Sequence, residues 1–242
     1  MNPTYAQKEL RERFGALELT VATLADLDRA VDALCAAYAT RGADDELAHD
    51  LCPYFGVIWP SARGLTLELA RRAPELAGKN VIELGCGLAL PALIAAKSGA
   101  RVTATDLHPD VPAFLARNLA LNGLAPEAVR YLELDWRTRG LGPHFDLVVA
   151  SDVLYEADHP APVARALAAH VAPGGRILLA DPGRAYLQAA LDELRALGFK
   201  HALAVERVAD LALDRAGDRQ TREVFVIDLW RAAETQTRRS PS

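Results

Sequence analysis

Cysteine is scarce in this chain, and its three cysteines lie far apart, at Cys35, Cys52 and Cys86. No two of them have the short spacing of a zinc-binding pair, so the sequence predicts no metal site. An odd and scattered set is also not the pattern of a disulfide framework. We therefore expect a reduced, cytoplasmic protein.

Long apolar runs and an excess of basic residues are missing as well. The start of the chain has no apolar core of a signal peptide, and no uninterrupted apolar run is long enough to span a membrane. The formal net charge is −5, whereas tight non-specific binding to nucleic acid requires many cationic contacts with phosphate. We expect neither a membrane nor a nucleic-acid partner, and we expect a monomer.

The composition is that of a folded protein, with 51% hydrophobic and 24% charged residues in a chain of 242. This length suffices for one α/β domain with a large core and an extension. We predict an N-terminal accessory region over 1–52, the main domain over 53–232 and a disordered tail over 233–242. The accessory region has a strand pattern at 17–21 and a helical pattern at 26–38, and could cover a substrate entrance or merely cap the core.

The stretch around which the chain is organised is 81–91. Val81 to Leu84 is a short apolar run with one carboxylate, which is typical of the end of a buried parallel strand. Gly85 and Gly87 then break the chain, and glycine allows positive φ and a close approach of the backbone to a ligand. An alanine-rich helical segment follows. Strand, glycine turn and helix predict a nucleotide-binding unit at the carboxyl edge of an open α/β sheet.

A second strand, over 101–106, ends in Asp106, which lies 19 residues after Gly87 (106 − 87). An acid at this distance can accept hydrogen bonds from ribose hydroxyls. The alternative is a plain strand–helix–strand unit with no ligand. A dinucleotide fingerprint would carry a third glycine near Leu90, and none is present.

Strand and helix patterns alternate regularly through the rest of the domain. Strands are predicted near 80–84, 101–106, 128–134, 145–150, 176–180, 199–208 and 222–230, and helices over 60–72, 88–98, 110–121, 161–171 and 184–197. The turn at 173–175 precedes the fifth strand, and the last two strands suggest an antiparallel hairpin. The fold class is a doubly wound, Rossmann-like, mostly parallel seven-stranded sheet that ends in an antiparallel hairpin.

Three further positions could carry chemistry, each with a simpler alternative. Asp135 and Trp136 follow the third strand, where a carboxylate can accept the adenine amino group and an indole can pack on the ring; they could instead cap a helix and fill the core. Asp152 ends the fourth strand and could orient an amine acceptor, or only cap a turn. Trp59 stands before a helix that starts at Pro60, and could be a core anchor.

These residues resemble a known family. Glu83-Leu84-Gly85-Cys86-Gly87 resembles motif I of the class I, seven-strand methyltransferases. The segment around Trp59, the pair Asp135-Trp136, and Asp152 with Tyr155 in an Asp-x-x-Tyr arrangement resemble family 16 of these enzymes, which are largely protein-lysine methyltransferases. The Asn/Asp-Pro-Pro-Tyr loop of methyltransferases that act on nucleic-acid amino groups is absent.

The resemblance implies an S-adenosylmethionine-dependent enzyme that methylates a lysine ε-amine of a protein. Gly85, Cys86 and Gly87 would cradle the cofactor, Glu83 would support the turn and Asp106 would bind the ribose. The remaining cofactor pocket would be lined by Trp59, Asp135, Trp136 and Ser151, and Asp152 and Tyr155 would position the amine. Asp181-Pro182-Gly183-Arg184 with Trp59-Pro60 also resembles the lysine methyltransferases of the electron transfer flavoprotein β subunit, although alone it is a turn.

Other functions remain open at this point. The fold could serve a small-molecule N- or O-methyltransferase, since fold does not fix substrate. A non-catalytic module that binds S-adenosylmethionine and a partner protein is a second alternative, and a nicotinamide-dependent dehydrogenase is a more distant one. His159, just beyond Tyr155, could accept a proton, but we expect a surface loop histidine.

Overall fold

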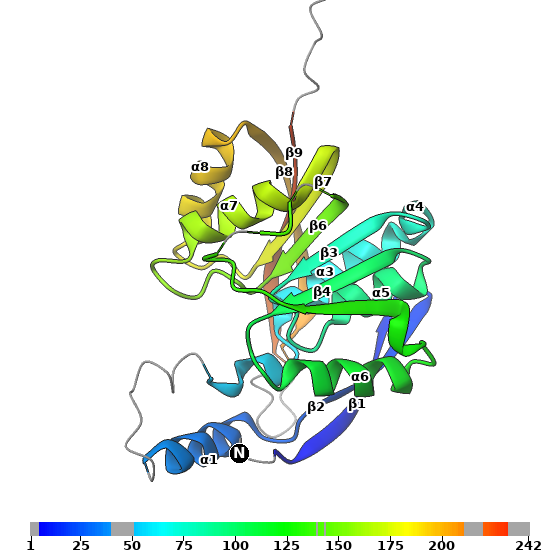
Figure 1. The fold of residues 1–242 in the computed structure, drawn as a ribbon, viewed down its shortest axis with the longest axis vertical. Coiled ribbons are helices and arrows are strands. Elements are labelled where there is room, and N and C mark those ends of the chain that lie inside the picture. The colour runs from blue at the N-terminus through cyan, green and yellow to red at the C-terminus, as the bar shows by residue number, and fades with distance from the viewer. Residues whose placement is uncertain (1–4, 40–50, 139, 143, 211–219, 232–242) are drawn as a thin grey trace, which may run out of the picture.

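The computed structural model describes residues 5–39, 51–138, 140–142, 144–210 and 220–231. A seven-stranded sheet forms the middle layer, and Figure 1 shows helices α7 and α8 on one side of it and α5 and α6 beyond the other strands. A separate two-stranded sheet lies near the N-terminus. Among the helices of the described residues, none combines the length and the apolarity that a membrane span requires.

The sheet has the order β5-β4-β3-β6-β7-β9-β8. The strands are β3 (Asn80–Leu84), β4 (Arg101–Asp106), β5 (Val129–Glu133), β6 (Phe145–Ser151), β7 (Val171–Asp181), β8 (Phe199–Ala209) and β9 (Thr221–Arg231). Strands β3 to β7 pair in parallel, whereas β9 pairs antiparallel with both β7 and β8. The predicted fold class is confirmed, including the closing hairpin, whose second strand lies inside the sheet.

Both faces of the central strands are buried, which explains their nearly continuous apolar sequence. Along β6, Val149 joins the core on the side of α5 and Val148 joins the core on the side of α7. In β7, Ile177 joins the core on the side of α7 and Leu178 joins the core on the side of α5. The side chains alternate because successive Cβ atoms of a strand point to opposite faces. Two apolar cores therefore pack against the two faces of the sheet.

The predicted helices are present with small changes at their ends. They are α3 (Pro60–Arg71), α5 (Leu90–Lys97), α6 (Val111–Leu121), α7 (Pro160–His170) and α8 (Leu187–Ala196), with the short helices η1 (Pro53–Gly56), α4 (Ala73–Leu76) and η2 (Pro126–Ala128). Pro60 and Pro160 each begin a helix, where the missing N–H of proline costs no hydrogen bond. The turn expected at 173–175 lies within β7, where the register with β6 shifts.

The N-terminal region is a β-hairpin of β1 (Gln7–Phe14) and β2 (Leu17–Leu24), followed by α1 (Leu27–Ala39). Its apolar side chains belong to the main core. Asn118 of α6 is fully buried; its Oδ1 accepts from the Ala22 backbone N at 2.7 Å and its Nδ2 donates to the Leu88 carbonyl at 3.2 Å. The hairpin thus caps the core beside the glycine turn. The predicted tail, 233–242, lies outside the described residues.

Candidate active site

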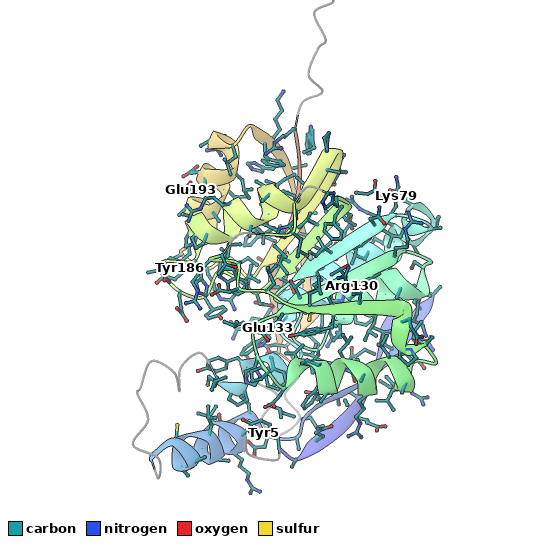
Figure 2. The ribbon with its side chains drawn as sticks, in the orientation of Figure 1. Tyr5, Lys79, Arg130, Glu133, Tyr186 and Glu193 are labelled. Carbon is teal, nitrogen blue, oxygen red and sulfur yellow. The ribbon has the colours of Figure 1, made fainter. Side chains whose placement is uncertain are left out.

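A cavity of about 450 Å³ lies at the carboxyl edge of the sheet, where the strand order reverses around β3. In Figure 2, Glu133 and Tyr186 mark the side on which the parallel strands end, opposite Lys79 and Arg130 near the strand beginnings. The cavity brings together all but one of the predicted site residues: Trp59, Gly85, Cys86, Gly87, Asp106, Asp135, Trp136, Ser151, Asp152 and Tyr155. Glu83 does not line it.

The glycine turn after β3 forms a closely packed wall of this cavity. Gly85 and Gly87 both have positive φ, at 63° and 49°. A Cβ atom on Gly85 would lie 2.9 Å from Val153 and 3.0 Å from Trp136, and one on Gly87 would lie 3.0 Å from the Phe55 carbonyl oxygen. Only glycine fits such positions, so the turn presents bare backbone to the cavity.

Glu83 supports the turn from behind. It is buried, and its Oε2 accepts a hydrogen bond from the Ala92 backbone N, in the first turn of α5, at 2.9 Å. Burial raises the pKa of Glu83 well above its usual range, although the bond from Ala92 opposes this. The side chain therefore ties the end of β3 to the start of α5 and does not face a ligand.

Asp106 occupies the end of β4, as the sequence predicts for a ribose-binding acid. Its Oδ2 accepts from the Gly87 backbone N at 2.8 Å, and its Oδ1 accepts from the His108 backbone N at 2.9 Å. Burial raises the pKa of Asp106, and these two backbone hydrogen bonds oppose the shift. A carboxylate oxygen can accept more than one hydrogen bond, so a fixed acceptor pair faces the cavity.

Asp135 and Trp136 follow β5 at one end of the cavity. Arg137 fixes the Asp135 carboxylate through its backbone N at 2.8 Å and its Nε at 3.0 Å. Burial acts to raise the pKa of Asp135, but the hydrogen bonds from Arg137 outweigh it and leave this pKa below its usual range. Trp136 is half-buried and reaches Gly85. An ionised acceptor and an aromatic wall lie side by side here.

Trp59 lies at the start of α3, on another wall. Its Nε1 donates to the Tyr54 carbonyl oxygen at 2.8 Å, and the Tyr54 and Trp59 rings meet edge to face. The indole is half-buried. Trp59 therefore has both roles considered for it. It anchors the segment through its hydrogen bond to Tyr54, and it lines the cavity.

Asp152 follows β6 with a left-handed backbone, at φ 59°. Its Oδ2 accepts from the Ser61 backbone N, at the start of α3, at 3.0 Å. The Nη1 atom of Arg184 lies 2.8 Å from Asp152 Oδ1 and donates to Asp181 at 2.9 Å. Burial raises the pKa of Asp152, and the ion pair with Arg184 lowers it in part. Oδ1 is buried and has Arg184 as its ion-pair partner; because a carboxylate oxygen can accept more than one hydrogen bond, it keeps capacity for a ligand.

Tyr155 is 49% exposed and lies at the rim, where its ring meets that of His159 edge to face with centroids 4.5 Å apart. His159 also packs edge to face on Trp136, at 5.3 Å. The expectation of a surface loop histidine is wrong, because His159 is only 5% exposed. It lies just before α7 and is enclosed by the rings of Trp136 and Tyr155. The sequence pattern around His159 does not indicate this enclosure.

Comparison with known proteins agrees with this geometry. The model of the lysine methyltransferase family, methyltransferase family 16, matches residues 53–189, which is more than half of the chain. This chain belongs to the lysine methyltransferase family. The matched segment runs from η1 to the start of α8 and includes the glycine turn, Asp106, Asp152 and Tyr155.

Two curated relatives of this family member carry specific names. The electron transfer flavoprotein beta subunit lysine methyltransferase of Mus musculus is 32% identical over 134 residues, which cover 54% of this chain and 51% of the relative. A protein N-lysine methyltransferase of Danio rerio is 38% identical over 106 residues, covering 41% of this chain and 47% of the relative. The chain thus spans about half the length of these relatives.

A solved structure supports the fold of this lysine methyltransferase family member. The precorrin-6y methyltransferase of Geobacter metallireducens superimposes with a TM-score of 0.54 at 19% sequence identity, covering 68% of this chain and 87% of the other. At this identity the likeness concerns the fold alone. It agrees with the class I methyltransferase architecture seen in the sheet order.

Several residues that line the cavity of this family member were not predicted from the sequence. Tyr54, His108, Arg137 and Glu156 all face the cavity. Arg137 could have been found, because an arginine two residues after Asp135 is well placed to pair with it. The inward position of His108 depends on the packing of its ring on Phe55 of η1, at 4.2 Å, which is a contact distant in sequence.

Proposed function

We propose that this chain transfers a methyl group from S-adenosylmethionine to the ε-amine of a lysine in a protein. The observation that carries the proposal is that one cavity is lined both by Asp106 and Trp136, to which we assign the nucleoside, and by Asp152 and Tyr155, to which we assign the amine. Family membership and the names of the curated relatives support the same activity.

The residues present fit S-adenosylmethionine. There is no room for a Cβ atom at Gly85 or Gly87. The backbone itself can therefore lie against a ligand there. Asp106 offers fixed acceptors for ribose hydroxyls, and Asp135 and Trp136 suit an adenine ring. When bound, the cofactor would supply an electrophilic methyl carbon, with its sulfur as the leaving group.

The protein's own part is to hold a neutral amine in line with that methyl carbon. The buried Oδ1 of Asp152 can accept a hydrogen bond from the amine, and the ion pair with Arg184 limits the excess negative charge beside it. A cationic amine emerges from the transfer, and the nearby carboxylate stabilises the developing charge.

The rim of the cavity supports a protein substrate. Tyr54 and Tyr155 both line the cavity and are 46% and 49% exposed, so the cavity reaches the surface through two aromatic side chains. A lysine side chain can enter between such rings, whose faces attract cations. An enclosed cavity would have favoured the alternative of a small-molecule acceptor. A cytoplasmic, monomeric protein with no nucleic-acid or membrane partner stays a prediction from charge and cysteine content.

The test is transfer of radiolabel from S-adenosylmethionine to proteins of a cell extract. We compare the wild type with Asp152→Asn, which keeps the shape of the side chain and tolerates positive φ, and with Asp192→Asn, an exposed carboxylate on α8. We expect a discrete labelled protein band with the wild type and the control variant, and loss of that band in Asp152→Asn with cofactor affinity kept.

The other outcomes separate the alternatives. Label found only in small molecules would favour a small-molecule methyltransferase. Absence of any label with the cofactor still bound would favour a non-catalytic module. Full transfer by Asp152→Asn would remove Asp152 from the amine site while leaving the activity itself intact.

A further inference from the structure

Glu156 and His159 face each other in the wall of the cavity, three residues apart in the loop that leads into α7. The Nε2 atom of His159 lies 3.5 Å from Glu156 Oε2. The other ring nitrogen, Nδ1, lies 3.0 Å from the Val153 carbonyl oxygen. A carbonyl oxygen only accepts, so Nδ1 must carry the hydrogen and donate it. In the neutral ring, Nε2 therefore holds a lone pair.

This arrangement sets a ring lone pair opposite a carboxylate oxygen. Two acceptors facing each other repel unless a proton resides on one of them. His159 is enclosed by Trp136 and Tyr155 and is only 5% exposed, so its ring cannot turn away freely. Glu156 is about one-third exposed and lines the cavity. The pair is thus built to take up one proton from the cavity side.

The remaining carboxylates of the cavity wall are already engaged by donors or cations. Asp106 accepts from two backbone N–H groups. Asp135 is held by Arg137, and Asp152 is paired with Arg184. Glu156 differs from them in that it faces the Nε2 atom of His159, a ring nitrogen that can hold a further proton.

The second histidine of the wall, His108, is not equivalent. Its Nδ1 accepts from the Asp110 backbone N at 3.2 Å, and its Nε2 lies 3.1 Å from the Leu51 carbonyl, to which it must donate. Both nitrogens are used by the backbone. Burial also lowers the pKa of His108, which opposes protonation. His159 with Glu156 is therefore the better proton acceptor.

A lysine ε-amine is protonated in water near neutral pH and must lose one proton before its lone pair can attack. We propose that the Glu156–His159 pair accepts this proton, an inference that rests on the proposed function. The ammonium gives one proton to the pair and becomes a neutral amine, the pair becomes an imidazolium–carboxylate, and the proton then passes to solvent. Glu156 contacts the ammonium and His159 stores the charge.

The groups around His159 are consistent with this role. Glu156 and Asp158 both lie close enough to share a ligand with the ring, and Asp135, itself paired with Arg137, interacts electrostatically with it. Carboxylates thus surround the ring on the cavity side. Tyr155 packs on the ring and lies at the rim, so the pair lies next to the predicted amine-positioning residue.

The first test needs no methyl acceptor. In ¹⁵N-histidine NMR, with the His159 signal assigned from a His159→Phe variant that keeps an aromatic ring between Trp136 and Tyr155, we expect the Nδ1–H tautomer. An Nε2–H tautomer would overturn the proposal, because Nε2 could then accept no proton.

The second test follows the labelled protein band across pH. Near neutral pH we expect Glu156→Gln to lose about a hundredfold in rate, the scale of general-base catalysis. The rate of the variant should approach that of the wild type at about pH 10, where lysine loses its proton to water without a base. The control is Asp192→Asn, which removes an exposed carboxylate of α8 that does not line the cavity.

The outcomes distinguish the alternatives. A loss in Glu156→Gln that is the same at every pH would show a structural role and overturn the proposal. A rate abolished by EDTA and equally by Asp158→Asn would indicate a bound cation in place of a proton, and would overturn it too. A wild type that labels no band at any pH would refute the lysine activity itself, while the NMR result decides the pair separately.

Discussion

The Nη1 atom of Arg184 lies 2.8 Å from Asp152 Oδ1 and also hydrogen-bonds Asp181 at 2.9 Å. One cation therefore compensates two carboxylates at the ends of neighbouring strands, and the side chains of both acids are almost inaccessible, at 7% and 0% exposure. Two buried like charges this close would repel without it. Arg184 couples the ends of β6 and β7 at the amine side of the cavity.

Replacing Arg184 by glutamine should therefore cost stability. We expect Arg184→Gln to lower the free energy of unfolding by about 3 kcal/mol, the lower end for a broken buried pair, because Arg184 itself is partly exposed. Arg195→Gln is the control, since its pair with Asp192 is exposed and should be worth less than about 0.5 kcal/mol. Urea unfolding measures both. Equal losses in the two variants would show that Arg184 is an ordinary surface arginine.

The glycine turn gives a second prediction with a matched control. Gly85 and Gly123 have almost the same positive φ, at 63° and 66°, but a Cβ atom would meet Val153 and Trp136 at Gly85 and nothing within 4 Å at Gly123. Gly123→Ala should cost about 1–2 kcal/mol from backbone strain alone. Gly85→Ala should cost a further ~1–3 kcal/mol from overpacking.

The overlap at Gly85 should also displace the indole of Trp136. We expect Gly85→Ala to change the tryptophan fluorescence and to weaken cofactor binding in calorimetry, whereas Gly123→Ala should change neither. If the two variants lost equal stability and bound the cofactor equally, the close packing at Gly85 would have no role in the site.

Much of the fold could be predicted because it follows from local rules. The strand over 80–84, the glycine turn and the helix beginning at Pro60 depend on apolar runs, positive φ and the missing proline N–H, all of which are visible within a few residues. The cavity-facing position of Asp106 followed from the spacing that a strand–helix–strand unit imposes.

What could not be predicted depends on contacts distant in sequence. Strand β1 was missed because it is a charged and mostly exposed sequence that becomes a strand only by pairing with β2. The burial of His159 comes from Trp136, and the pairing of Arg184 with Asp152 joins residues 32 apart (184 − 152). Neither contact leaves a periodic signal in the sequence.

Asp106 should control cofactor affinity through its charge. In Asp106→Asn one oxygen can still accept from Gly87, so the variant removes the negative charge with little change in shape. We expect S-adenosylmethionine to bind about tenfold or more weakly in calorimetry, the scale of a hydrogen bond to a charged group. Glu133→Gln is the control, because Glu133 pairs with Asp106 in the sheet but is exposed and does not line the cavity. Unchanged affinity in Asp106→Asn would remove it from the ribose site.

Glu83 leads to a prediction about pH. Its pKa in the folded protein lies well above its usual range because of burial, so the folded state binds more protons than the unfolded state above about pH 4.3. Stability contributed by protonated Glu83 is therefore lost as pH rises through the folded pKa. Glutamine is neutral at every pH and can still accept from Ala92, so the advantage of Glu83→Gln over the wild type should grow as the pH rises above about 4.3 towards the folded pKa.

Urea unfolding at several pH values measures this difference, with Glu193→Gln as the control because Glu193 is exposed on α8 (Figure 2). The pKa values of Asp106 and Asp152 are also raised. The free energy of unfolding should therefore depend less on pH in Glu83→Gln than in the wild type, but some dependence should remain. A stability difference that stays constant with pH would mean that Glu83 ionises as easily in the folded chain as in the unfolded one. In that case its hydrogen bond to α5, and not its protonation, would be what supports the glycine turn.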